Sequence, residues 1–376
     1  MISKIHIKGL KSIRDMTLEC SGLNLIVGTN SSGKSTFLQA ILLYAQNSGE
    51  AIGLNGKIIS LGEFREVRNY HMPNNSIRIE LWQDKNENLS WIEFVEDKEK
   101  DEYKIKNFID DKKSVKGTIG DGENVSINLV SKFYLHYLSC HRVGPMDIYE
   151  KNIMERDNLG INGEFALAYL LKNESEPIDK EMVIKNEDTT DSLLSQVNYW
   201  LNYIVGTVLQ INDLKKTNYL QVKYNNDSDS ASLDALYCRP INVGAGISYL
   251  ISIIITCLAS KQGDILIIEN PEIHLHPKAQ SRLGEFLYHI SNVRRQLFVE
   301  THSDHIFNSI RVGITQKRFQ QEEVRVYFFA LDDNHETQCN PIIFGEYGKI
   351  IGKNQYMDIN DLFDQFEIDL DKMLGL

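Results

Sequence analysis

The stretch of residues 23–44, LNLIVGTNSSGKSTFLQAILLY, constrains the fold of this chain more than any other part of the sequence. Its apolar run at residues 25–27 predicts a buried strand, and residues 28–35 fit G-x-x-x-x-G-K-S/T, the pattern of a phosphate-binding P-loop. Apolar residues then recur at helical spacing between Phe37 and Ala45, which predicts a helix. A strand before the loop and a helix after it are the structural context that this motif requires.

The residue types in this loop each have a physical reason. Gly28 and Gly33 allow the backbone to curl so that its N–H groups point at phosphate oxygens. The N-terminus of the following helix adds a positive dipole end. Lys34 supplies a point charge for the β- and γ-phosphates, and the Ser35 hydroxyl can ligate Mg²⁺. The alternative is a glycine-rich turn with an incidental lysine, and the predicted flanking strand and helix argue against it.

Length and charge bound the class of protein. The chain has 376 residues, of which 42% are hydrophobic, so it can bury one large core or two smaller ones. The net charge of −12 argues against a protein coated in nucleic acid, although it leaves room for a local basic groove.

Cysteine usage and hydropathy indicate the compartment. The 5 cysteines are scattered and odd in number, which favours free thiols in a reducing environment. The N-terminus has no apolar signal-peptide region. The longest apolar segment, residues 249–258, is too short to span a bilayer. We therefore expect a cytoplasmic protein that does not contact a membrane.

Hydrophobic periodicity predicts further strands and helices. Strands are expected at residues 2–7, 16–18, 77–82, 91–95, 103–108, 133–138, 219–224 and 231–238. Polar turns between the three strands from residue 77 to residue 108 indicate an antiparallel meander. Amphipathic helices are expected from residue 162 and at residues 193–209, where Trp200 should lie in the core. No heptads are sustained between the P-loop and residue 240, so coiled-coil arms are not expected.

Residues 104–116, in and after the last predicted strand of the meander, contain five lysines: Lys104, Lys106, Lys112, Lys113 and Lys116. Acidic residues are interleaved with them, so we interpret the stretch as a solvated face in preference to a nucleic-acid patch. Nucleic acid stays an open alternative as a partner.

A second group of motifs lies between residues 242 and 304. NVGAGISYL at residues 242–250 is a glycine turn that opens an apolar helix, and such a turn either binds an anion or simply caps the helix. Residues 265–268 predict a buried parallel strand that ends at Glu269, and a helix is expected at residues 277–290. The next strand, residues 296–299, leads to His302. Ligands of open α/β sheets bind at this carboxyl edge, where Glu269 can hold Mg²⁺ through water.

Three further residues have two interpretations each. His274 and His276 form H-x-H, which could chelate a metal, but without a third ligand in view we favour packing or capping. Arg142 could reach a phosphate, but a structural ion pair is the preferred interpretation.

Together these motifs resemble the ATP-binding-cassette-type ATPases of the SMC/RecF/OLD group. IKGLKSIRD through GTNSSGKST resembles the opening strand and Walker A motif, and NVGAGISYL stands where that group has its signature motif. ILIIENPE resembles Walker B, ETHSDH resembles the histidine switch, and PEIHLHP is typical of compact prokaryotic members. The resemblance is close over the motifs and loose over residues 76–240, and no room is left for a fused toprim nuclease after residue 312.

The resemblance implies a role for each motif residue. The triphosphate would be held by Asn30, Ser31, Ser32, Gly33, Lys34, Ser35 and Thr36. Mg²⁺ would be held by Ser35 and Glu269, and His302 would contact the γ-phosphate or the attacking water. Gly244, Gly246 and Ser248 would complete the site of a second subunit, in a head-to-tail dimer that closes on two nucleotides. Lys11 and Ser12 stand where relatives have residues near the nucleotide.

One position departs from the pattern of the group. Relatives usually carry a second acid at the end of Walker B, and here that position is Asn270. An amide cannot accept the proton of the attacking water, so general-base help is lost there. Glu272 either replaces the missing base or acts as a structural acid at a helix end, and the sequence favours neither.

The expected fold is an α/β P-loop NTPase of the ABC-ATPase type, with a mixed central sheet and flanking helices, an antiparallel β lobe, a helical lobe and no coiled-coil arms. We divide it into an N-terminal ATPase lobe (residues 1–150), a helical insert (151–240), a C-terminal ATPase lobe (241–312) and a small C-terminal domain (313–376).

The leading functional hypothesis is a slow Mg²⁺-dependent ATPase that forms nucleotide-sandwich dimers or higher homo-oligomers. It would act as the sensor or motor of a separate effector, such as a nuclease or a toxin, in antiphage defence or DNA maintenance. The first alternative is an ATP-binding scaffold with little turnover, which Asn270 favours. The second is a DNA-repair ATPase similar to RecF.

Overall fold

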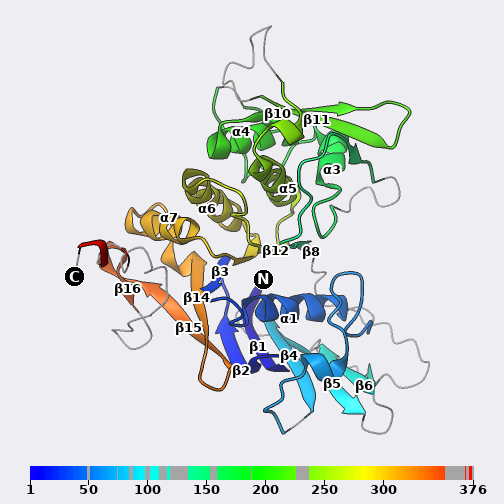
Figure 1. The fold of residues 1–376 in the computed structure, drawn as a ribbon, viewed down its shortest axis with the longest axis vertical. Coiled ribbons are helices and arrows are strands. Elements are labelled where there is room, and N and C mark those ends of the chain that lie inside the picture. The colour runs from blue at the N-terminus through cyan, green and yellow to red at the C-terminus, as the bar shows by residue number, and fades with distance from the viewer. Residues whose placement is uncertain are drawn as a thin grey trace. The chain divides into compact units, whose positions relative to one another are not determined.

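The fold is described from a computed structural model. It describes residues 1–48, 51–73, 75–83, 88–97, 102–109, 117–118, 134–152, 159–187, 189–225, 237–351, 369 and 372–374. The chain divides into two compact units, here called unit 1 (residues 1–134 and 320–376) and unit 2 (residues 135–319). Figure 1 labels their helices and strands.

An antiparallel sheet forms much of unit 1. Its strand order is β2-β1-β4-β5-β6-β7. The strands are β1 (Ile2–Leu10), β2 (Ile13–Glu19), β4 (Ser76–Gln83), β5 (Asn88–Asp97), β6 (Glu102–Ile109) and β7 (Gly117–Thr118). Side chains along β4 alternate between buried and half-buried, as expected of a strand with one face on a core. The two predicted opening strands and the predicted meander are therefore confirmed. Lys112, Lys113 and Lys116 lie outside the described residues.

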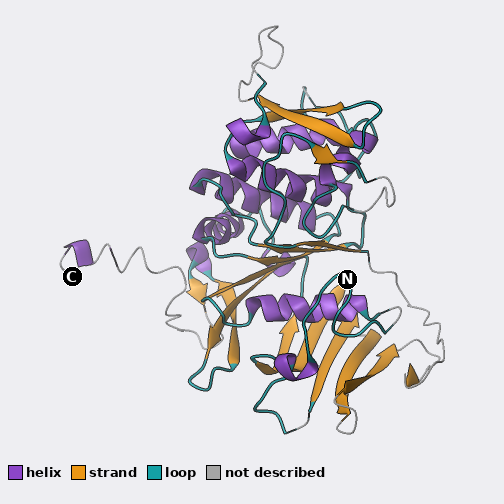
Figure 2. Cartoon of the chain, turned by 45° about the vertical axis from the view of Figure 1, so that its right-hand side comes forward, coloured by secondary structure: helices purple, strands orange, loops and turns teal. Residues whose placement is uncertain are grey.

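Helix α1 (Lys34–Gln46) lies over one face of this sheet (Figure 2). The buried Tyr44 hydroxyl of α1 donates to Ser90 Oγ of β5 at 2.6 Å. The helix therefore presents its apolar side to the sheet and anchors it with one buried polar contact. A short helix, α2 (Phe64–Val67), follows in the loop before β4.

The second strand system of unit 1 contains the P-loop strand. It comprises β3 (Leu23–Gly28), β14 (Val324–Leu331), β15 (Thr337–Phe344) and β16 (Ile350–Ile351), with the 3₁₀ turns η2 (Gln321–Glu323) and η3 (Glu346–Gly348). β14 runs parallel to β3 and antiparallel to β15, which pairs with β16. Residues 313–376 are predicted from the sequence to form a small C-terminal domain, and β14, within that range, pairs directly with the P-loop strand β3. Local hydrophobic patterns do not reveal pairing between strands so far apart in sequence.

Unit 2 has a parallel sheet of order β13-β12-β8, made of β8 (Leu135–Leu138), β12 (Ile265–Glu269) and β13 (Gln296–Glu300). Every residue of β12 and β13 is buried, which explains their continuous apolar sequences, because parallel strands are covered on both faces. The strands predicted from residues 265 and 296 are confirmed. β8 covers residues 135–138 of the strand predicted at residues 133–138, and residue 133 lies outside the described residues.

Helices make up most of the rest of unit 2. They are α3 (Ala166–Asn173), α4 (Leu193–Val205), η1 (Pro240–Asn242), α5 (Ala245–Ala259), α6 (Pro277–Ser291) and α7 (Asp304–Thr315). α4 packs against α5 and α6, and α6 packs against α7 (Figure 1). The ring of Trp200 meets Phe286 edge-on at 4.9 Å between centroids, so the prediction that Trp200 belongs to the core is confirmed.

The predicted helix at residues 193–209 is too long. α4 ends at Val205 because Gly206 takes a left-handed conformation (φ 73°) and its N–H bonds back to the Asn202 carbonyl, a common way to end a helix. The chain then enters a small antiparallel sheet of order β10-β11-β9, made of β9 (Tyr149–Glu150), β10 (Val208–Asp213) and β11 (Tyr219–Asn225). The strand predicted at residues 231–238 lies mostly outside the described residues, although Cys238 forms a bridge with Tyr224.

The longest described helices, α5 and α6, have 15 residues each. The described part of the chain thus contains no long coiled coil, as the sequence predicted. None of the described helices is long and apolar enough to cross a membrane.

Gly244, the N-cap of α5, and Gly246, in its first turn, differ in what surrounds them. A Cβ on Gly246 would lie 2.4 Å from the carbonyl oxygen of His274, whereas a Cβ on Gly244 would meet nothing within 4 Å. Only a glycine at residue 246 allows α5 to approach the loop after β12 this closely. Residue 244 is under no such constraint, because open space surrounds it.

This difference predicts opposite outcomes for a matched pair of variants. Gly246→Ala should lower the free energy of unfolding by about 1–3 kcal/mol, because the methyl group overpacks against backbone that cannot swing away. Gly244→Ala should stay within about 0.5 kcal/mol of wild type, since the small loss at a helix N-cap is offset by lower unfolded-state entropy. Urea unfolding followed by circular dichroism measures both. Equal destabilisation by the two variants would contradict the packing argument.

Candidate functional site

Two glycines give the P-loop of unit 1 its shape. Gly28 has φ 139°, and a Cβ there would lie 2.0 Å from the carbonyl oxygen of Phe329 on β14. Gly33 has φ 99° and directly precedes α1. Only glycine adopts both conformations without strain, so the loop leaves β3 along a path that no other residue type would permit.

Lys34 is folded into the loop. Its Nζ donates to the carbonyl oxygens of Gly28 at 3.1 Å and Thr29 at 2.6 Å, and the residue is only 3% exposed. The inner side of the loop therefore holds a buried positive charge. The first turn of α1 contains no acidic residue and its N-cap makes no side-chain hydrogen bond, so the positive end of the helix dipole acts at the same place.

The remaining predicted loop residues divide into two groups. Asn30, Ser31 and Ser35 are exposed, and Ser35 lies in the first turn of α1, where a hydroxyl can meet a ligand. Ser32 and Thr36 are buried, and Ser32 Oγ donates to the Thr29 carbonyl at 2.7 Å. The Ser32 side chain thus supports the loop backbone from inside, and contact of Ser32 with a triphosphate stays a prediction.

The structure brings Ser12 to the P-loop together with Thr337, a residue that sequence reasoning missed. Thr337 Oγ1 donates to Ser12 Oγ at 2.8 Å, and its N–H donates to the Ser12 carbonyl at 2.8 Å. A Cβ on Gly33 would lie 2.3 Å from Thr337 Oγ1. Lys11 instead reaches α1, where its Nζ donates to Gln39 Oε1 at 2.8 Å.

In unit 2, Glu269 ends β12 with both carboxylate oxygens held. The Tyr137 hydroxyl donates to Oε1 at 3.0 Å, and the backbone N–H of Cys140 donates to Oε2 at 3.1 Å. Burial, followed by the negative charge of Glu269, raises the pKa of Tyr137 far above its usual value, so Tyr137 stays a hydrogen-bond donor. Donors to both oxygens fix the orientation of the Glu269 carboxylate. Sequence reasoning identified Glu269 and missed Tyr137 and Cys140.

Arg142 has a structural role. Its guanidinium donates to the backbone carbonyls of Ser139, Glu269 and Asn270, and the residue is 3% exposed. Both interpretations from sequence, a phosphate contact and an ion pair, therefore miss its observed contacts. Arg142 thereby links the end of β8 to the end of β12. A sequence does not show which side chain will donate hydrogen bonds to which buried backbone carbonyls.

Glu272 links two loops at the same sheet edge. Its Oε2 accepts from the Thr301 hydroxyl at 2.8 Å and its Oε1 accepts from the His302 N–H at 2.6 Å. Burial raises the pKa of Glu272, and these two donors oppose that shift. A carboxylate with a raised pKa is a better base, yet both oxygens also act as acceptors in a structural link. The geometry is compatible with either role.

Asn270 occupies the left-handed region, with φ 44°. Its N–H donates to the carbonyl of Glu300 at 2.8 Å, which joins the loops after β12 and β13. Glu269 and Glu300 lie opposite each other in the parallel register, so two buried glutamates end neighbouring strands. His302 follows at an exposed position. The carboxyl edge of this sheet therefore gathers Glu269, Glu272 and His302 as predicted, and adds Glu300.

The predicted signature residues do not share one environment. Gly244 is exposed at the N-terminus of α5, while Gly246 packs against His274. Ser248 is 3% exposed, and its hydroxyl lies close to the phenols of Tyr149 and Tyr224. The Ser248 side chain thus points into unit 2, and its contribution to the site of a second subunit stays a prediction.

The H-x-H pair has the capping and packing roles that the sequence favoured. His276 is the N-cap of α6 and its side chain accepts from the Lys278 N–H at 3.3 Å, while the His274 ring packs on Tyr249 at 5.2 Å. Within the described ranges, no group of three or more His, Cys, Asp or Glu side chains could hold a metal ion.

Comparisons with known proteins agree with this geometry. The family model of the AAA ATPase domain matches residues 1–230 and 147–307. No curated protein matches the sequence.

Among solved structures, the Smc head bound to the C-winged helix domain of ScpA is similar. Its TM-score is 0.59 at 12% identity, over 91% of this chain and 98% of that chain. The Smc head domain with an extended coiled coil, bound to the C-terminal domain of ScpA derived from Pyrococcus furiosus, has a TM-score of 0.56 at 12% identity. That match covers 91% of this chain and 96% of that one.

These matches bear on fold and family. At 12% identity the Smc heads show the fold alone, and they confirm the predicted α/β architecture of SMC-type ATPase heads. The family model spans well over half of the residues. The chain therefore belongs to the AAA ATPase domain family, as an AAA-type ATPase with the fold of an SMC head.

Proposed function

We propose that this protein binds ATP with Mg²⁺ at the P-loop and hydrolyses it slowly. One observation carries most of the proposal: Lys34 is buried at the centre of a loop whose glycine conformations and uncapped helix end suit phosphate. The side chains of Asn30, Ser31 and Ser35 are exposed beside it and complete the proposed nucleotide site.

Ser35 and Glu269 are the proposed holders of Mg²⁺. Both offer oxygen ligands, which hard cations prefer, and Tyr137 and Cys140 hold the Glu269 carboxylate in one orientation. When bound, the ion neutralises charge that develops on the phosphates. We propose His302 as a contact of the γ-phosphate or of the attacking water.

The nucleotide site can be tested with one buried lysine. Lys34→Ala removes the positive charge at the centre of the loop, and charged hydrogen bonds are worth about 1.5–3 kcal/mol each, so ATP affinity should fall by about 10–100-fold. Isothermal titration with ATP measures the change. Lys57→Ala, at an exposed lysine of the same unit, is the control and should bind ATP as wild type does. A folded Lys34→Ala protein with unchanged affinity would refute the site.

A second candidate function, an ATP-dependent switch with little turnover, is favoured by Asn270. That position carries an amide where SMC-type relatives usually carry the second acid, so slow hydrolysis and a long-lived ATP-bound state are expected. The two candidate functions use the same site and differ in the rate of ATP hydrolysis. That rate depends on whether Glu272 acts as a base.

Three variants separate a base from a structural acid at this position. If Glu272 is the base, Glu272→Gln should slow phosphate release by about 10²–10⁴-fold. Thr301→Val removes a hydrogen bond to Glu272 but keeps its carboxylate, so it should slow release far less. Equal losses in both variants would show that Glu272 only positions the loop. If turnover is limited by the missing acid, Asn270→Glu should instead raise the rate.

We also propose that ATP drives self-association through the N-terminal end of α5. Three large apolar side chains are exposed nearby: Met146 at 41%, Ile148 at 45% and Ile241 at 50%. Asp147 and Arg239 form an ion pair at 3.1 Å, which joins the two segments that carry them. An exposed apolar cluster beside an open helix end is typical of an interaction surface. A separate effector, such as a nuclease or a toxin, is the proposed recipient of the nucleotide signal.

The association surface predicts a selective defect. Ile241→Asp places a charge in the exposed apolar cluster, so it should weaken ATP-dependent oligomers by about tenfold or more while ATP binding to one subunit is kept. Light scattering with and without ATP gives the molar mass. Val312→Asp is the control, because Val312 is also exposed (45%) but lies on α7. Equal behaviour of both variants would argue against this surface.

A further inference from the structure

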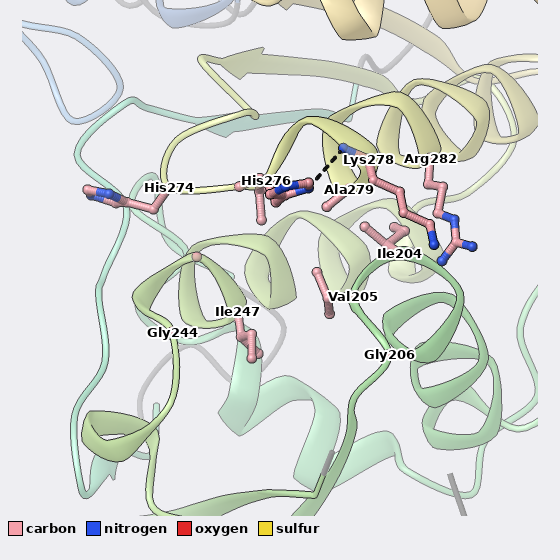
Figure 3. Close-up of a pocket in the computed structure, with 12 residues that line it drawn as sticks. Ile204, Val205, Gly206, Gly244, Ile247, His274, His276, Lys278, Ala279 and Arg282 are labelled. Atoms are coloured by element: carbon pink, nitrogen blue, oxygen red, sulfur yellow. Dashed lines mark hydrogen bonds between the residues drawn. The ribbon is translucent and has the colours of Figure 1, made fainter. Parts of the chain in front are cut away.

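The pocket of about 330 Å³ at the N-terminal ends of α5 and α6 (Figure 3) includes Gly244 and Gly246, so it belongs to the proposed self-association surface. The proposed function leaves another polar feature, in unit 1, without a role. This feature is the pair of hydroxyls of Ser12, in the turn between β1 and β2, and of Thr337, the first residue of β15.

Both hydroxyls lie against Gly33, the N-cap residue of α1. A Cβ on Gly33 would lie 2.3 Å from Thr337 Oγ1 and 3.2 Å from Ser12 Oγ. The start of α1 is where the proposed site receives phosphate, because backbone N–H groups and the positive end of the helix dipole are available there. Two hydroxyls that come from outside the P-loop therefore stand beside the proposed phosphate position.

The hydrogen bond between the two hydroxyls has a direction. Thr337 Oγ1 donates to Ser12 Oγ at 2.8 Å. Because a hydroxyl donates one proton and can also accept, Ser12 keeps its own proton for another acceptor. Among the described residues, none accepts the Ser12 proton. Thr337 is 8% exposed, whereas Ser12 is half-buried, so Ser12 is the member of the pair that can meet a ligand.

The turn that carries Ser12 is held from two sides. The Thr337 N–H donates to the Ser12 carbonyl at 2.8 Å. From the other side, the buried Asn69 side chain donates to the Lys11 carbonyl at 2.7 Å, and the Lys11 N–H donates to the Val67 carbonyl at 2.7 Å. A turn that is already fixed loses little conformational entropy when one of its side chains binds a ligand.

We propose that Thr337 is a positioning residue of the nucleotide site, which directs the Ser12 hydroxyl proton toward a phosphate oxygen of bound ATP. Thr337 acts through Ser12 and does not touch the nucleotide. A hydroxyl that accepts a hydrogen bond is polarised and donates more strongly, and a charged phosphate oxygen is a strong acceptor. The inference rests on the proposed function, because it requires ATP at the P-loop. It gives β15 a part in nucleotide binding.

The test uses full-chain variants and isothermal titration with ATP. Thr337→Val keeps the shape of the side chain and removes its proton donor, so ATP affinity should fall by about three- to tenfold. Thr337→Ser restores the hydroxyl and should stay within about twofold of wild type. Ser12→Ala removes the donor to the phosphate and should weaken binding by about tenfold or more.

A double variant separates positioning from support of the fold. If Thr337 acts through Ser12, then Thr337→Val should not weaken ATP binding further in the Ser12→Ala background. Urea unfolding of the same proteins measures their stability, so affinity and stability are compared separately. Thr17→Val is the control, because Thr17 is exposed on β2 of the same hairpin, and it should bind ATP as wild type does.

Two results would overturn the inference. Wild-type affinity in Thr337→Val would show that the residue has no part in binding, and equal losses from Thr337→Val in both backgrounds would show that it only supports the loop. Unchanged affinity in a folded Lys34→Ala protein would instead overturn the proposed site and this inference with it. If Lys34→Ala loses affinity and Thr337→Val does not, the site stands and the inference alone is wrong.

Discussion

The P-loop depends on one close backbone contact, between Gly28 and Phe329. The position that a Cβ would occupy on Gly28 is 2.0 Å from the Phe329 carbonyl, so β14 can run beside β3 only because residue 28 has no side chain. The Thr29 N–H then bonds to the same carbonyl at 3.3 Å. The N-terminal loop that defines the site is thus held in place by a strand from the last fifth of the chain.

Support from distant segments recurs throughout unit 1. Thr337, at the start of β15, bonds to Ser12 through both its hydroxyl and its N–H and fills the space beside Gly33. Tyr327 on β14 donates from its hydroxyl to the Glu19 carbonyl. The strands that follow residue 320 are therefore structural parts of the P-loop unit. Removing them would leave the backbone around Gly28 and Gly33 without its partners.

Local patterns in the sequence predicted most strands and helices, and also the identity of the P-loop and of the acid at the end of β12. They succeeded because buried parallel strands and a P-loop leave continuous local signals. Contacts formed by the fold were not predictable. Tyr137 on β8 and Cys140 in the turn after it hold Glu269 from far away in the sequence, and the sequence patterns around them carry no sign of that role. Ser248 was expected near an open helix end. In the structure it lies on the side of α5 that faces the core, and it is buried.

The unusual amide at residue 270 also has a physical explanation that concerns the backbone. Asn270 has φ 44°, a region in which asparagine is several-fold enriched and longer side chains are strained. In that conformation its N–H reaches the Glu300 carbonyl and closes the loop between the ends of β12 and β13. The same loop lets Glu272 reach Thr301 and His302. Asparagine therefore suits the backbone conformation that this turn requires. Because the turn sets where Glu272 lies, the choice of residue at position 270 and the contacts of Glu272 with Thr301 and His302 are linked through one backbone conformation.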